Sequence, residues 1–195
     1  TVNHPSVVIW SLGNEAGPGD TFKDCYAAIK KYDQSRPVQY ERNNDIVDMG
    51  SNQYPSIAWV QGAVKGNYNM KYPYHISEYA HSMGNAIGNL VDYWNAIEST
   101  NFFMGGAIWD WVDQAMEGTD AKTGQKFWGY GGDFGMDNKP NDGMFCMNGV
   151  MRPDLSPKAQ YFEVKKVYQN VGVKAVDLKH GRIEIFNKNY FEPLK

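Results

Sequence analysis

Short apolar runs alternate with segments of helical periodicity along most of this chain. Each apolar run has the length of a buried strand, and glycine, proline or polar residues separate it from the next segment. This order predicts parallel strands joined by helical crossovers, because a tight turn cannot connect two parallel neighbours. The α/β fold classes that satisfy it are an open sheet and a (β/α)8 TIM barrel.

The alternation predicts about five strand–helix units of such a barrel. The predicted strands are 7–12, 38–41, 46–54, 75–79 and 102–111. The predicted helices are 21–32, 57–64, 90–97 and 157–169. A complete barrel needs roughly 250 residues. We therefore expect this chain of 195 residues to hold only a fragment of one.

Two later segments depart from the alternation. Residues 113–152 form a connection too long to serve only as a link, which predicts a binding loop. Two apolar runs around Lys179-His180-Gly181 predict an antiparallel hairpin. We expect residues 1–169 to be the C-terminal part of a barrel and 170–195 to begin a β-sandwich domain. Strand-like residues lie close to both ends, so the chain is expected to be a piece of a longer protein.

Charge and hydropathy argue against two classes of partner. The chain has 19 basic and 22 acidic side chains and a formal net charge of −3, which gives no basic footprint for nucleic acid or an anionic membrane. The longest strongly apolar stretch, 102–109, is far shorter than a bilayer requires. We therefore expect neither nucleic acid nor a membrane as a partner.

Two glutamates stand where predicted strands end. Glu15 follows the first strand through Gly13-Asn14, and Glu78 closes the strand 75–79. Side chains at the carboxyl ends of barrel strands meet at the catalytic face. Hydrolysis of a glycosidic bond needs two carboxyl groups, one as proton donor and one as nucleophile or base. One such glutamate would be an ordinary loop residue, but the pair favours a glycoside hydrolase.

Five strings occur in one order along the chain: NHPSVVIWSLGNE, SRPVQYE, SEYAHSMGN, GGAIWDWVDQ and YGGDFG…PND…FCMNG. Together they resemble glycoside hydrolase family 2, most closely its large bacterial β-galactosidases. The resemblance covers residues 3–155, and the tail resembles the start of the family's next β domain. SEYAHSMGN and WDWVDQ favour β-galactosidase over β-glucuronidase or β-mannosidase. Those two activities, and a non-catalytic carbohydrate-binding piece, stay open as alternatives.

The resemblance implies a role for each glutamate. Glu15 corresponds to the general acid/base and Glu78 to the nucleophile of a retaining hydrolase that releases terminal non-reducing β-D-galactose through a covalent galactosyl-enzyme intermediate. A retaining mechanism needs the two carboxyl groups ~5–5.5 Å apart.

The resemblance also implies contacts with the sugar. Asn14 would bind the 2-hydroxyl, Tyr54 would hydrogen-bond the nucleophile, and Trp109 would lie under the apolar face of galactose. His81 would contact the sugar hydroxyls, and Asn148 is included among the residues near the substrate.

Two cations follow from the same resemblance. Glu15 corresponds to a ligand of Mg²⁺, and Phe145 (through its carbonyl) and Asn148 correspond to ligands of Na⁺. The remaining ligands belong to a segment that precedes these residues, so both sites are expected to be incomplete and empty here. We expect the isolated chain to be inactive. The expected active form is a longer, homo-oligomeric protein of the bacterial cytoplasm or periplasm.

Overall fold

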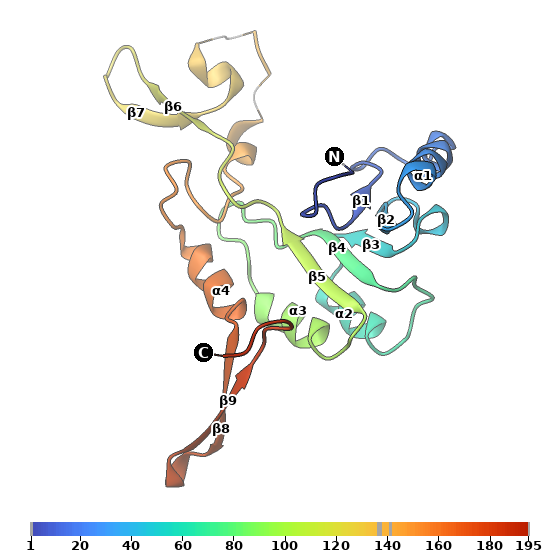
Figure 1. Cartoon of the computed structure of the whole chain (residues 1–195). Coiled ribbons are helices and arrows are strands. Elements are labelled where there is room, and N and C mark those ends of the chain that lie inside the picture. The colour runs from blue at the N-terminus through green and yellow to red at the C-terminus, as the bar shows by residue number, and fades with distance from the viewer. Residues whose placement is uncertain (1, 136–137, 141, 195) are drawn as a thin grey trace.

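Parallel strands form the body of the molecule, as the alternation predicts. The computed structural model describes residues 2–135, 138–140 and 142–194 (Figure 1). The strands of the body are β1 (Trp10–Ser11), β2 (Val38–Gln39), β3 (Gly50–Gln53), β4 (Tyr74–Tyr79) and β5 (Phe103–Ile108). β1 pairs with β2, and β3, β4 and β5 form a three-stranded parallel sheet in that order.

Backbone hydrogen bonds continue this order beyond the two sheets. The amides of Asp48 and Met49 donate to the Val38 carbonyl at 3.0 and 3.4 Å, which brings the start of β3 alongside β2. Past β5, a parallel bridge joins Val112 to Met151. A Cβ at Gly149 would overlap the Asp113 amide nitrogen, so this close approach requires glycine. The strands follow one another as in an arc of a barrel, and the described residues do not close it.

Four α-helices accompany the strands: α1 (Thr21–Tyr32), α2 (Ile57–Ala63), α3 (Leu90–Ile97) and α4 (Ala159–Val167). The predictions of 21–32 and 90–97 are confirmed to the residue, and α2 ends one residue early. α4 is shorter than predicted because Lys158, its N-cap, has extended backbone angles and the helix ends before Tyr168. No helix in the described part of the chain is long and apolar enough to cross a membrane.

Four predicted strands are shorter than expected. In place of 102–111, β5 ends at Ile108, and beyond it the Asp110 amide donates to the Asn148 carbonyl at 2.9 Å instead of to β4. In place of 7–12, β1 spans two residues, and Val8 is 64% exposed. In place of 38–41, β2 ends at Gln39. The predicted strand 46–54 begins only at Gly50, because a 3-10 helix (Asn44–Ile46) precedes it. The Asn44 side chain accepts from the Ser51 amide at 2.7 Å and donates to the Ser51 carbonyl at 2.9 Å, and this local pairing competes with a strand.

The predicted long loop 113–152 contains regular structure of its own. β6 (Met116–Thr119) and β7 (Lys126–Gly129) form an antiparallel hairpin, and 3-10 helices follow at Gly131–Phe134 and Gly143–Cys146. The Asp120 carboxylate accepts two backbone amides of the hairpin turn, at 2.7 and 3.0 Å. Residues 136, 137 and 141 of this predicted loop lie outside the described residues.

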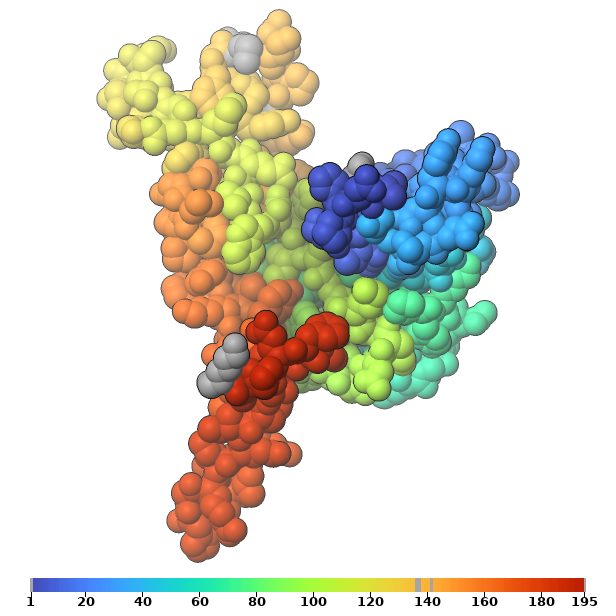
Figure 2. Space-filling model, in the orientation of Figure 1, coloured from blue at the N-terminus to red at the C-terminus, as the bar shows by residue number. Residues whose placement is uncertain are grey.

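The predicted C-terminal hairpin is confirmed. β8 (Val171–Asp177) and β9 (Arg182–Asn187) are antiparallel, joined by a 3-10 turn (Leu178–His180) and Gly181 at φ +67°. Figures 1 and 2 show this hairpin and β6–β7 projecting from opposite sides of the body. The domain division at residue 169 stays a prediction.

Two apolar clusters hold the body together. The larger lies between β4, β5, α2, α3 and α4, and its fully buried members include Ile76 and Tyr79 of β4. The smaller packs Val38, Tyr40 and Val47 against the inner side of α1. Burial of such side chains stabilises the fold by about 1.5–3 kcal/mol each. β4 is therefore the most firmly held strand of the sheet, and it carries Glu78.

Candidate functional site

A pocket of about 550 Å³ lies at the carboxyl ends of β1, β3, β4 and β5. Its lining comes from the ends of these strands, the segments that follow them and the 3-10 helix at 143–146: Asn14, Glu15, Tyr54, Glu78, His81, Met83, Trp109 and Phe145. Every residue that the sequence proposed for the site lines this pocket, except Asn148. The structure thus brings both carboxylates together at the face where barrel enzymes carry their catalysts.

A tyrosine that directly follows the neighbouring strand β3 holds Glu78. The Tyr54 amide donates to the Glu78 carbonyl at 2.8 Å, and the Tyr54 hydroxyl donates to Glu78 Oε2 at 2.9 Å. Burial raises the pKa of Tyr54 well above its usual value, and its hydrogen bond to Glu78 raises it further. Tyr54 therefore stays protonated at neutral pH and fixes the orientation of the Glu78 carboxylate.

The loop after β1 is hydrogen-bonded to the segment that follows β2 and to the end of β3. The Glu15 amide donates to Glu41 Oε1 at 2.8 Å, and the Gln53 side chain donates to Asn14 Oδ1 at 2.9 Å. Arg42 lies 3.8 Å from both Glu15 Oε2 and Glu41 Oε1. The Glu41 side chain is only 2% exposed, so its carboxylate serves this loop rather than solvent.

The sequence did not predict a role for Glu41 or Arg42. Glu41 closes the string SRPVQYE, and its place at the end of a predicted strand was the available signal. Met83, another residue that the sequence did not assign, lies in the string SEYAHSMGN and lines the pocket.

Three non-glycine residues around the pocket have left-handed backbone angles. These are Glu15 (φ 51°), Tyr54 (φ 46°) and Ala80 (φ 52°). Each such conformation costs about 1–3 kcal/mol and persists only where the surrounding structure enforces it. Tyr54 and Ala80 directly follow β3 and β4, and Glu15 lies in the loop after β1. Strain concentrated in this way is typical of a functional site.

Aromatic rings form the other wall of the pocket. The His81 ring centre lies 6.1 Å from that of Tyr54 and 5.6 Å from that of Phe145. Trp109 follows β5, and its amide donates to the Tyr79 carbonyl at 3.0 Å. Trp111 lies outside the pocket and packs against Tyr161 of α4. Rings beside carboxylates suit a ligand with both apolar and hydroxyl-bearing faces, such as a sugar.

Asn148 is buried behind the pocket. It is 2% exposed, and its carbonyl accepts from the Asp110 amide at 2.9 Å. Its side-chain Oδ1 is buried and has no hydrogen-bond partner within the described part of the chain. A buried acceptor of this kind needs a donor, a water or a cation. The Asn148 side chain is therefore better suited to bind a cation or a water than to contact a sugar in the pocket directly.

The described residues contain no group of three or more His, Cys, Asp or Glu side chains that could hold a metal ion. Glu15 thus has no cluster of carboxylate and imidazole ligands around it in the described chain. Mg²⁺ prefers near-octahedral oxygen coordination, and Glu15 with its neighbours here does not supply it.

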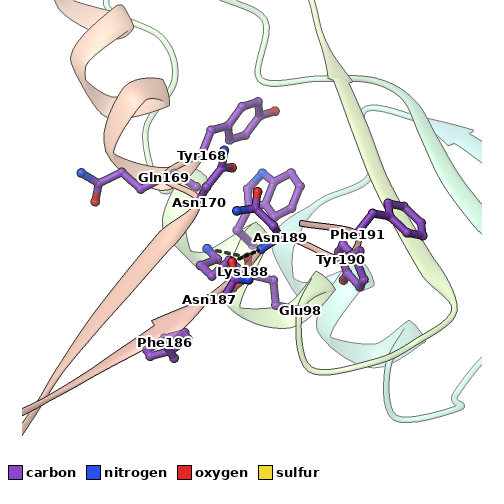
Figure 3. Close-up of a pocket in the computed structure, with 12 residues that line it drawn as sticks. Glu98, Tyr168, Gln169, Asn170, Phe186, Asn187, Lys188, Asn189, Tyr190 and Phe191 are labelled. Atoms are coloured by element: carbon purple, nitrogen blue, oxygen red, sulfur yellow. Dashed lines mark hydrogen bonds and ion pairs between the residues drawn. The ribbon is translucent and has the colours of Figure 1, made fainter. Parts of the chain in front are cut away.

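A larger hollow of about 760 Å³ lies between α3, α4 and the end of β9 (Figure 3). Its opposite charges, Glu98 and Lys188, form an ion pair at 2.6 Å. Its lining includes a single carboxylate, which this pair already neutralises. The chemistry of a carboxylate pair therefore belongs to the smaller pocket.

Curated relatives resemble the chain along almost its whole length. A protein of Priestia megaterium named beta-galactosidase is 43% identical over 197 residues, covering 98% of this chain and 19% of that protein. Beta-galactosidase 2 of Enterobacter cloacae is 39% identical over 204 residues, covering 98% of this chain and 20% of that protein. The chain spans about a fifth of the length of these relatives.

Solved structures share the fold at low sequence identity. A GH2 beta-galacturonidase from Eisenbergiella tayi, bound to glycerol, has a TM-score of 0.56 and 20% identity, covering 99% of this chain and 35% of that chain. A beta-glucuronidase from Ruminococcus gnavus has a TM-score of 0.51 and 22% identity, covering 86% of this chain and 33% of that chain. These similarities show the fold alone.

A family model identifies the fold independently. The model for glycosyl hydrolases family 2, TIM barrel domain, matches residues 1–173. This agrees with the arc of parallel strands and with the position of the pocket at their carboxyl ends. The chain belongs to glycosyl hydrolase family 2 and holds part of that family's TIM barrel domain.

Proposed function

We propose that this chain is the part of a retaining β-galactosidase that carries both catalytic carboxylates, Glu15 and Glu78. The observation that supports this most is the shared pocket, in which Tyr54 holds Glu78 while Glu15 lies on the adjoining loop. The relatives named beta-galactosidase favour galactose as the sugar. The activity is proposed for the longer protein, because the chain spans about a fifth of those relatives.

In the first step, Glu78 attacks the anomeric carbon of the galactoside. The Glu78 oxygen forms a covalent bond to that carbon while the bond to the leaving oxygen breaks, and Glu15 donates its proton to that oxygen. The hydrogen bond from Tyr54 holds Glu78 Oε2, so the carboxylate meets the sugar in one orientation.

In the second step, Glu15 acts as a base. It takes a proton from water, whose oxygen attacks the anomeric carbon and displaces Glu78, and β-galactose leaves with retained configuration. We propose that the Asn14 side chain binds the 2-hydroxyl, where contacts strengthen in the transition state. Trp109 would support the apolar face of the ring, and His81 would bind hydroxyl groups.

The lining of the pocket argues for a neutral sugar over a uronic acid. A uronate carries a carboxylate that needs a cationic or strongly donating partner when buried. The residues that line the pocket include no lysine or arginine. A β-glucuronidase is therefore the less favoured alternative, although solved relatives with that activity share the fold.

Cations are part of the proposal only where the residues fit. For Na⁺, the buried Asn148 Oδ1 offers an unpaired oxygen, and the Phe145 carbonyl would be a second ligand. A bound Na⁺ would supply positive charge beside the sugar hydroxyls. For Mg²⁺, the residues around Glu15 do not make a site, and Glu15 could ligate this ion only with residues from elsewhere in a longer protein.

Hydrolysis of two aryl glycosides tests the activity and the sugar. In the full-length protein that contains this chain, we expect turnover of 4-nitrophenyl β-D-galactoside and little turnover of the β-D-glucuronide. Glu78→Gln should lower kcat for the galactoside on the order of 10³-fold or more, because it removes the nucleophile. Glu98→Gln, on the surface beside Lys188, is the matched control and should retain normal turnover.

Two results would refute the proposal. Preferential hydrolysis of the glucuronide would reassign the sugar, and unchanged kcat in Glu78→Gln would remove Glu78 from the mechanism.

A further inference from the structure

Helix α4 and the residue after it contact the strand end and the loop that carry two proposed site residues. β4 ends with Glu78 and Tyr79, and the following loop contains His81. Two polar side chains reach this segment, and neither lines the pocket: Tyr168, just after α4, contacts Tyr79, and Gln160 of α4 contacts the loop beyond His81.

The first contact is between two tyrosine hydroxyls. The hydroxyls of Tyr79 and Tyr168 lie 2.5 Å apart, and the indole of Trp94 on α3 donates to the Tyr79 hydroxyl at 2.8 Å. The Trp94 ring packs edge-on against Tyr168 at 5.0 Å. Tyr79 is fully buried, so this group ties the backbone next to Glu78 to two helices. Tyr168 is labelled in Figure 3, at the end of α4.

The second contact fastens the loop beyond His81. The Gln160 side-chain nitrogen donates to the Gly84 carbonyl at 2.6 Å and to the Ser82 carbonyl at 3.3 Å. Gln160 is 9% exposed, and Ser82 is fully buried. A buried amide that satisfies two backbone carbonyls fixes a loop at a point where no secondary structure would hold it.

Backbone strain lies between these two contacts. Ala80 has φ 52°, a conformation that alanine keeps only where its neighbours enforce it. Its neighbours are fixed on the other side by the backbone of Trp109, which accepts from the Ser82 amide at 2.8 Å and donates to the Tyr79 carbonyl at 3.0 Å. The segment 78–84 is therefore held between Trp109 and α4.

We infer that Tyr168 and Gln160 are positioning residues that set the placement of Glu78 and His81 through the segment 78–84. The inference rests on the proposed function for its catalytic consequence. Neither residue would touch the sugar. A displacement of the nucleophile by as little as 1 Å lowers the rate of a reaction that needs aligned atoms, so removal of these contacts should act on kcat more than on KM.

The test uses Tyr168→Phe, Gln160→Met and the double variant in the full-length protein that contains this chain. Tyr168→Phe removes only a hydroxyl, and Gln160→Met removes the donor while nearly preserving volume. The controls are Tyr161→Phe and Gln169→Met, the same changes on side chains that α4 and its C-terminal end do not direct at the segment. Kinetics with 4-nitrophenyl β-D-galactoside, thermal unfolding and amide hydrogen exchange of residues 78–84 are measured for all five.

Each single variant should lower kcat about 3–10-fold, as expected for loss of one hydrogen bond, and the double variant should lower it further. KM should stay within about twofold. Exchange within 78–84 should accelerate in the test variants and not in the controls.

Three results would overturn the inference. They are an unchanged kcat with a lower melting temperature, an equal loss of kcat in the controls, and failure of all test variants to fold. A wild-type protein that is inactive on the galactoside would refute the proposed function instead. Hydrogen exchange would then still decide whether Tyr168 and Gln160 hold the segment.

Discussion

Strands β4 and β9 have the same length and similar apolar side chains, but opposite surroundings. Each has six residues. In β4, Ile76 and Tyr79 are fully buried between two parallel neighbours and the helices. In β9, Ile183 is 54% and Ile185 is 60% exposed, because β8 is the only strand paired with β9 among the described residues.

The difference shows that the burial of a strand is decided by its partners and not by its own pattern. It also explains the location of the candidate site. Catalytic groups need rigid support, and Glu78 lies on the strand with the most complete packing. The projecting hairpins offer no comparable support.

After loss of the proposed nucleophile, the largest expected effect comes from Glu15. Glu15→Ala removes the proposed proton donor, so kcat for galactosides with poor leaving groups should fall on the order of 10²–10⁴-fold. Activated aryl galactosides should lose less in the first step, because their leaving groups need little protonation. Azide should restore turnover by attacking the intermediate without a base and releasing galactosyl azide, detected by mass spectrometry. The same change at Glu98, between α3 and the hairpin, should have no such effect.

The difference in packing between β4 and β9 should appear in how much each strand contributes to the free energy of unfolding. Ile76→Ala should lower the free energy of unfolding by about 2–5 kcal/mol, because it opens a cavity in the larger cluster. Ile185→Ala in β9 should change it by about 0.5 kcal/mol or less in this chain. Urea denaturation of the 195-residue chain measures both. Equal losses would contradict the comparison, and a larger cost of Ile185→Ala in a longer protein would show that further residues cover the hairpin.

A smaller effect on stability is expected at low pH from Asp33, whose carboxylate accepts a hydrogen bond from Trp10 beside the smaller apolar cluster. Hydrogen bonds from Ser35, from the Trp10 indole and from Arg36 hold the pKa of Asp33 well below its usual value. The ionised carboxylate therefore stabilises the fold at neutral pH, and this contribution is lost as the pH falls below about 4, where the unfolded chain takes up the proton. Asp33→Asn should lower the urea midpoint at pH 7, and the difference in midpoint between wild type and variant should be smaller at pH 3. A larger difference in midpoint at pH 3 would contradict the lowered pKa of Asp33.

The sequence predicted the elements whose signals are local. The helix 21–32 follows from apolar spacing between a polar start and Arg36-Pro37, and the hairpin after residue 170 follows from its glycine turn. Strand lengths were overestimated where the outcome depends on distant groups. The Asn44 side chain, for example, bonds with the Ser51 backbone and so delays β3, which no periodicity reveals.

The candidate site shows the same division. Glu15 and Glu78, which both line the pocket, were predicted as site residues because strand ends and distinctive strings mark them. Glu41, Gln160 and Tyr168 were not found, because their relation to the site is a contact across 26 residues or more of sequence. Such contacts become visible only when the chain is folded.

Covalent trapping of the intermediate tests the central proposal most directly. A 2-deoxy-2-fluoro-β-galactosyl fluoride should react with the full-length protein that contains this chain, because the fluoride leaves readily while the 2-fluoro group slows the second step. Peptide mass spectrometry should find one fluorogalactosyl group, attached to Glu78, and none in Glu78→Gln. A label on Glu15 or on any other residue, or full galactosidase turnover with no label at all, would contradict the assignment of Glu78 as the nucleophile.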